Sequence, residues 1–79
     1  MLVKIINELT DTDFSNLENV PDKEINFDLS EVKFLSSRTI TRMLILSKKG
    51  KRLLLSQPNE HIRETVKILN LEEILRIQA

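Results

Sequence analysis

The sequence predicts a small α/β domain in which a mostly parallel or mixed sheet of about four strands carries helices packed on it. Apolar residues alternate along the chain between short strand-like runs and segments of helical spacing. This order of strand, helix, strand, helix, strand, helix is the one that right-handed crossovers convert into a parallel sheet. With 79 residues, no linker and no repeat, residues 1–79 are expected to form a single domain.

The first two elements are a strand and a short helix. Residues 2–6 form an apolar run interrupted only by Lys4, too short for a useful helix. Residues 10–12 supply N-cap chemistry, and Pro21 ends the segment that follows. Its apolar positions at three-residue spacing are Phe14, Leu17 and Val20. A helix of two turns is therefore expected between them.

The middle of the chain predicts a strand, the longest helix and a further strand. Residues 25–29 alternate between apolar and polar, which is typical of a strand with one buried face. A helical stripe then begins at about Ser37 or Arg38 and ends near Gly50. The uninterrupted run at residues 53–55 indicates a strand that lies centrally in the sheet and is covered on both faces.

The last elements are a helix and a segment of ambiguous spacing. Residues 60–70 return to helical periodicity, and Asn70 is suited to a left-handed helix cap. Residues 74–77 fit either a last short strand or the start of a terminal helix, and we favour the strand.

Composition excludes several classes of protein. Without cysteine, the chain can form neither a disulfide framework nor a thiolate metal site, which favours the reducing cytoplasm. No apolar run approaches the roughly 20 residues that span a bilayer, so direct membrane insertion is not expected. The N-terminal run at residues 1–6 is also too short for a signal peptide.

Charges are segregated along the chain although they sum to zero. Residues 1–31 hold eight acids and two bases, whereas residues 32–52 hold seven bases and no acid. A basic surface raises the question of nucleic acid, but the three aromatic residues are all Phe at positions expected to be interior. No nucleic-acid partner is therefore expected, and cations at a helix C-terminus explain much of the cluster.

The chain offers little for catalysis, so we expect no enzyme, no cofactor and no metal. His61 is the only imidazole and stands on a helix expected at the surface. The serines lack a glycine-rich elbow and an evident base. A single glycine, Gly50, cannot build a phosphate-binding glycine loop.

One cluster exceeds what helix capping requires. A single hydroxyl caps a helix, yet several stand near the start of the longest helix together with two arginines one turn apart. A phosphoryl group there would meet unpaired N–H donors and the positive end of the helix dipole. The cluster of Ser36, Ser37, Arg38, Thr39, Thr41 and Arg42 therefore indicates either a phosphate site or a partner-binding surface, and the family resemblance described next implies the second.

Residues 27–44 run from a strand through Asp28, Leu29 and Ser30 and the spaced Val32 and Phe34 to the hydroxyls at the start of a helix. This pattern resembles the STAS domain, named for sulfate transporters and anti-sigma factor antagonists. Its hallmark runs from a strand through Asp-Leu-Ser and a spaced Val and Phe into Asp-Ser-Ser-Gly and a helix. The matching positions are Asp28, Leu29, Ser30, Val32 and Phe34. Downstream, residues 53–60 and the segment through Val66 to Ile74 also look like the family, so the resemblance covers almost the whole chain.

The resemblance implies a non-catalytic regulatory protein of bacteria that binds a histidine-kinase-like anti-sigma factor and thereby regulates transcription. Ser37 occupies the position of the serine that is phosphorylated in such antagonists, with Ser36 as the second candidate. Ser36 replaces the family's preceding Asp, and Arg38 and Thr39 replace its Ser-Gly. Two alternatives follow: a small STAS subunit that contacts the ATPase of an ABC-type lipid transporter, and a structural adaptor.

The chain also resembles a minimal version of the family, without its usual first strand and last helix. An exposed sheet edge or apolar patch is then available to a partner. The oligomeric state stays open.

Overall fold

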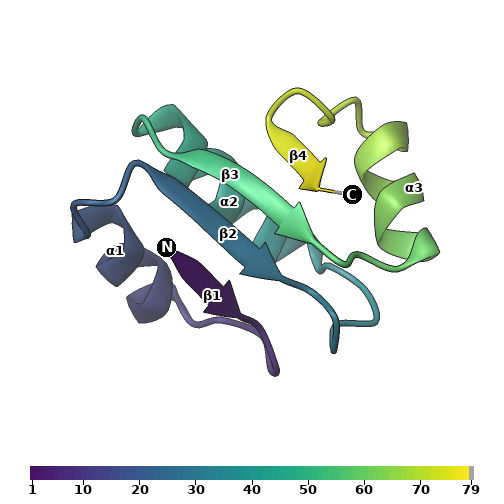
Figure 1. Cartoon of the computed structure of the whole chain (residues 1–79), viewed down its shortest axis with the longest axis horizontal. Helices are drawn as coiled ribbons and strands as arrows, with labels where there is room; N and C mark the ends of the chain where they lie inside the picture. Colours follow the sequence, from purple (N-terminus) through teal and green to yellow (C-terminus); the bar gives the residue numbers. More distant parts are fainter. Residues whose placement is uncertain (79) are drawn as a thin grey trace.

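The computed structural model describes residues 1–78 and shows an α/β fold with four strands and three helices in alternation (Figure 1). The elements are β1 (Leu2–Lys4), α1 (Asp11–Asn19), β2 (Glu24–Asp28), α2 (Ser37–Lys48), β3 (Arg52–Ser56), α3 (Glu60–Ile68) and β4 (Leu75–Gln78). The strands form one parallel sheet in the order β1-β2-β3-β4. The predicted fold class is confirmed, and residues 75–78 form the strand that we favoured over a terminal helix.

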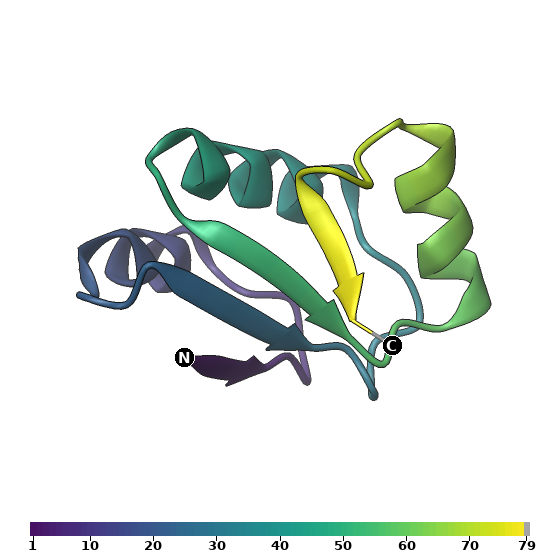
Figure 2. The ribbon, with the colours of Figure 1, turned by 45° about the horizontal axis from the view of Figure 1, so that its top comes forward.

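All three helices lie on one face of the sheet (Figure 2). Each crossover leads to the neighbouring strand, and crossovers of one hand then place every helix on the same side. The burial of β3 follows from this arrangement: Leu53 and Leu55 are buried toward the helices, whereas Leu54 lies on the open face and is only half-buried. The prediction that residues 53–55 are covered on both faces is therefore wrong, although β3 is an interior strand.

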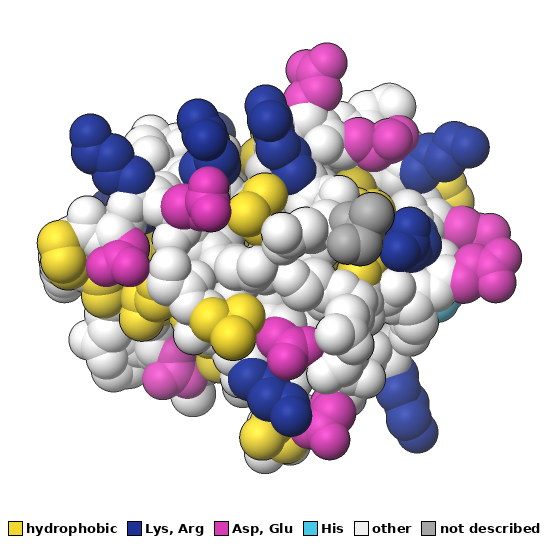
Figure 3. Space-filling view, in the orientation of Figure 1, with side chains coloured by type: hydrophobic (Ala, Val, Ile, Leu, Met, Phe, Trp, Pro, Cys, Tyr) yellow, Lys and Arg dark blue, Asp and Glu magenta, His cyan; other side chains and the backbone are white. Residues whose placement is uncertain are grey.

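The open face of the sheet is mixed in character. Figure 3 looks onto it and shows hydrophobic side chains in small groups among charged ones. Three polar side chains link the strands across this face: Asn26 donates to Gln78 at 2.8 Å, and Ser56 donates to the Asn26 side chain at 2.5 Å. A polar ladder of this kind makes the uncovered face compatible with water.

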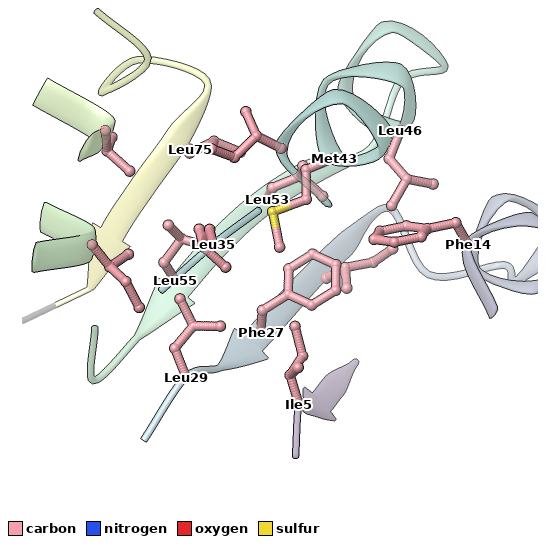
Figure 4. Close-up of a cluster of buried hydrophobic side chains, with 14 of the residues drawn as sticks. Ile5, Phe14, Phe27, Leu29, Leu35, Met43, Leu46, Leu53, Leu55 and Leu75 are labelled. Atoms are coloured by element: carbon pink, nitrogen blue, oxygen red, sulfur yellow. The ribbon is translucent and has the colours of Figure 1, made fainter. Parts of the chain in front are cut away.

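The core lies between the sheet and the helices, where the labelled side chains of Figure 4 converge. Phe14 of α1 and Met43 of α2 pack with Phe27 of β2, and all three are almost fully buried. Burying such side chains supplies about 1.5–3 kcal/mol each relative to exposure, which is the main favourable term for a domain of this size.

Local chemistry sets the helix ends. Thr10 and Asp13 form a capping box at the start of α1. At the end of α2, the amide of Gly50 donates to Ser47 and the amide of Lys51 donates to Leu46, the paired bonds of a Schellman motif. Gly50 has φ 94°, a conformation that favours glycine. The left-handed cap expected at Asn70 is also present, with φ 56°.

Charges that are segregated in the sequence meet in the folded chain. The Arg38 guanidinium on α2 lies 2.9 Å from the Asp11 carboxylate on α1, and Lys49 lies 3.2 Å from Glu18. The Lys51 ammonium donates to two backbone carbonyls of the α1–β2 connection. Four of the seven bases in residues 32–52 are thus ion-paired with acids of the first third.

Within residues 1–78, no helix combines the length and the apolar character needed to cross a membrane.

Candidate functional site

The candidate site lies where two parallel strands end. Residues 5–10 leave β1 and residues 29–36 leave β2 at the same edge of the sheet, the usual place for binding sites in parallel α/β proteins. Between these connections is an open groove of about 340 Å³, lined by residues 5–8 and 31–36 together with Thr39. The start of α2 forms one end of the groove.

Two of the predicted hydroxyls hold the start of α2 in place. Ser36 is the N-cap, and its Oγ accepts a hydrogen bond from the Thr39 amide at 3.2 Å. The Ser36 hydroxyl also donates to the carboxylate of Glu8, and the buried Thr39 hydroxyl donates to the same oxygen at 3.2 Å. The hydroxyls of Ser36 and Thr39 therefore both form hydrogen bonds that stabilise the fold.

Glu8 is a site residue that we did not predict. The hydrogen bond from Ser36 is the largest cause that lowers its pKa, followed by the bond from Thr39, while the charge of Arg38 contributes less. The carboxylate is consequently ionised at neutral pH. In the sequence, Glu8 stands out only as an acid in the connection after the first strand. Ser36 lies in the corresponding connection after the second strand.

Ser37 is different from its neighbours. It is the first residue of α2 and is exposed, and its hydroxyl makes no hydrogen bond to any residue from 1 to 78. Its carbonyl accepts a bond from the Thr41 hydroxyl at 2.8 Å, which engages the fourth hydroxyl of the cluster. Of the four, Ser37 alone presents an exposed, unengaged hydroxyl.

The two arginines lie along the α1–α2 contact. Arg38 is exposed and paired with Asp11, as described above. The Arg42 Nε is buried and lies 3.8 Å from the other Asp11 oxygen, while its guanidinium carbon lies 5.8 Å from the centre of the Phe14 ring. Arg38 is therefore available at the surface, whereas Arg42 mainly joins the two helices.

Phe34 corrects a further expectation. Phe14 and Phe27 are interior as predicted, but the Phe34 side chain is 64% exposed on the wall of the groove. The chain turns after β2 so that Leu29 and Leu35 point into the core instead. This places an aromatic surface beside the start of α2.

The chain matches no protein-family model and no curated protein. In fold it is similar to the NMR structure of the protein TM1081, with a TM-score of 0.72 at 20% sequence identity. The similarity covers 98% of this chain and 71% of that one. At this level of identity the likeness concerns the fold alone.

Proposed function

We propose that this chain is a non-catalytic, cytoplasmic regulatory domain of the STAS type, which binds a protein partner through the start of α2 and is controlled by phosphorylation of Ser37. In function it would resemble an anti-sigma factor antagonist. The partner would be an anti-sigma factor that is also a serine kinase, and the outcome would be regulation of transcription.

The availability of Ser37 carries this proposal. The Ser36 hydroxyl caps α2, the buried Thr39 hydroxyl bonds to Glu8, and the Thr41 hydroxyl bonds to a backbone carbonyl. The Ser37 hydroxyl, in contrast, is exposed and forms no hydrogen bond within residues 1–78. A kinase needs a hydroxyl that its active site can reach and whose modification breaks no hydrogen bond that holds the fold. Ser37 meets that requirement at the position where the resemblance places the modified serine.

Phosphorylation would change the surface without catalysis by this chain. It adds about −1.5 to −2 charges, which the N-terminal end of a helix stabilises. The neighbouring Arg38 would then have two acidic partners, the phosphate and Asp11. The added bulk, together with the cost of desolvating the phosphate, would remove a partner that packs closely on this surface.

A second candidate function is that of a small STAS subunit that contacts the ATPase of an ABC-type lipid transporter. The observation that favours it is the replacement of the family's Asp by Ser36, whose hydroxyl is already bound to Glu8. Arg38 is likewise held by Asp11. Such a surface can dock without any phosphate.

The test compares Ser37→Asp and Ser37→Ala with the wild type in binding to purified candidate partners. The candidates are the serine-kinase ATPase and the ABC ATPase encoded nearest to this chain's gene. Ser15, exposed on α1, supplies the matched control Ser15→Asp. We expect the kinase to bind wild type, Ser37→Ala and Ser15→Asp, and not to bind Ser37→Asp. It should phosphorylate only wild type and Ser15→Asp. Binding of the transporter ATPase to all four proteins would replace the first function by the second.

Arg38 tests the surface independently of the switch. Arg38→Glu reverses an exposed charge beside Ser37, and we expect it to weaken partner binding. Unchanged binding by this variant would place the contact elsewhere on the chain.

A further inference from the structure

The groove beside α2 exposes apolar surface that the fold does not need. Phe34 is 64% exposed and Ile6 is 65% exposed, and both line the groove. Large exposed side chains that share one hollow are typical of binding surfaces, and a rigid aromatic ring is a frequent anchor in protein interfaces.

A fixed negative charge lies in the same groove. The carboxylate of Glu8 is positioned by the hydroxyls of Ser36 and Thr39, and no basic side chain within residues 1–78 forms an ion pair with it. The other acid of the groove, Glu31, already faces Lys4 at 3.8 Å. Glu8 therefore offers a preorganised acceptor without an ion-pair partner among residues 1–78, although the charge of Arg38 helps to lower its pKa and Lys33 also lines the groove.

These two features select the chemistry of an occupant. A phosphate, a nucleotide or an acidic peptide would meet two carboxylates, those of Glu8 and Glu31, against the single lysine of the lining, Lys33, so the groove as a whole repels it. A cation beside apolar groups satisfies both walls at once. The volume of about 340 Å³ suits one or two side chains, and Ser36, the residue before Ser37, lines the groove.

We propose that this groove binds a segment of a partner protein in which an arginine or lysine is flanked by apolar residues. The basic side chain lies on the Glu8 carboxylate, and an apolar neighbour packs on Phe34 and Ile6. The inference deepens the proposed function and rests on it for the identification of this end of the molecule as the partner surface.

Four synthetic peptides test the chemistry without knowledge of the partner. They are capped pentapeptides with Arg or Glu at the centre, flanked on both sides by Leu or by Ser, each titrated into ¹⁵N-labelled protein. We expect the Leu-Arg-Leu peptide to give saturable amide shifts at Glu8, Phe34 and Ser36. Its Leu-Glu-Leu and Ser-Arg-Ser counterparts should bind about tenfold or more weakly, a difference of about 1.4 kcal/mol.

Variants of the groove and of a remote face supply the controls. Glu8→Gln and Phe34→Ala are each expected to weaken the Leu-Arg-Leu peptide about tenfold, equivalent to about 1.4 kcal/mol. Matched changes on α3, Glu64→Gln and Ile68→Ala, alter an exposed acid and a 75% exposed isoleucine and should leave binding unchanged. Ile6→Ala is a second test of the apolar wall. Should Glu8→Gln disturb the cap of α2, the comparison of the Arg and Glu peptides on wild type still tests the charge.

Three results would overturn the groove as the site: equal responses to the Arg and Glu peptides, shifts that map away from the groove, or no saturable shift at all. The proposed function fails separately. Loss of partner binding in Ser37→Asp without any peptide binding keeps the regulatory function and removes the groove. Peptide binding at Glu8 without binding of either candidate ATPase keeps the groove and removes the regulatory function.

Discussion

The carboxylate of Glu8 accepts a hydrogen bond from the hydroxyl of Thr39 at 3.2 Å, although 31 residues separate them in the sequence. The contact joins the connection after β1 to the first turn of α2. Thr39 is buried, so the bond also satisfies a polar group that water does not reach. The hydrogen bonds of Glu8 therefore connect the groove directly to the start of α2.

Glu8→Gln is expected to lower stability at neutral pH and to have little effect in acid. The folded state lowers the pKa of Glu8, so its stabilising contribution is complete above the usual glutamate pKa of about 4.3 and is lost as the pH falls through the lowered value. Urea denaturation at a series of pH values measures the difference between wild type and variant.

That comparison isolates Glu8 because Asp28 titrates in both proteins. The amide of Ser30 donates to the Asp28 carboxylate at 3.0 Å and is the first cause that lowers its pKa. A constant stability difference between wild type and Glu8→Gln from neutral pH to pH values below the titration would show that the Glu8 charge contributes nothing.

Ser37→Asp is expected to stabilise the isolated domain by about 0.3–1 kcal/mol, because an acid at the first position of α2 complements the helix dipole. Ser37→Ala should lie close to wild type. The gain should shrink in high salt, which screens exposed charges. Thermal denaturation measures all three, and a destabilised Ser37→Asp would mean that its loss of partner binding reflects unfolding.

Phe27→Ala and Phe34→Ala should differ sharply in stability. Phe27 is fully buried, and truncating a buried Phe costs about 3–5 kcal/mol, a large part of the stability of a small domain. Phe34 is exposed, so its truncation should change stability by no more than about 0.5 kcal/mol. Chemical denaturation of the pair measures the contrast; similar losses would place Phe34 in the core.

The ion pair between Asp11 and Arg38 should contribute little. Both side chains are exposed, and such pairs typically couple by about 0.2–1 kcal/mol. A double-mutant cycle with Asp11→Ala and Arg38→Ala at low and high salt measures the coupling. Coupling well above this range that persists in salt would contradict a screened surface pair.

Gly50→Ala should destabilise the domain by about 1–2 kcal/mol, because its positive φ is unfavourable for a residue with a Cβ. Apart from Gly50 and its two chain neighbours, no heavy atom of residues 1–78 lies within 4 Å of the position that a Cβ would occupy, so the loss comes from the backbone alone. Gly50→Asn should be less harmful, since Asn tolerates this conformation. Equal stability of all three proteins in thermal melts would show that the cap is unimportant.

Local patterns predicted the elements well because their causes are local. The alternation around Ile25 and Phe27 reflects one buried face, and the hydroxyl at Ser36 marks the start of α2. Burial beyond a single strand depends on what packs on it. The apolar run around Leu54 carries no information about whether a second layer of helices exists, and among residues 1–78 no helix covers that face.

The candidate site was predicted only in part for a related reason. The hydroxyls and arginines of α2 are adjacent in the sequence, so their cluster is visible there. Glu8 joins them through contacts that span 28 and 31 residues. The exposure of Phe34 likewise depends on the path of the connection after β2, where Leu29 and Leu35 take the interior positions.

The simple strand order has a kinetic consequence. Strands that are consecutive in the chain are neighbours in the sheet. Leu2 of β1 lies opposite Asn26 of β2, and Leu53 of β3 lies opposite Leu75 of β4. Partners therefore lie no more than about 30 residues apart, which keeps the loop-closure entropy of every pairing small. During synthesis, each newly emerged helix and strand can add to an edge that is already formed, so the sheet can assemble in the direction of translation.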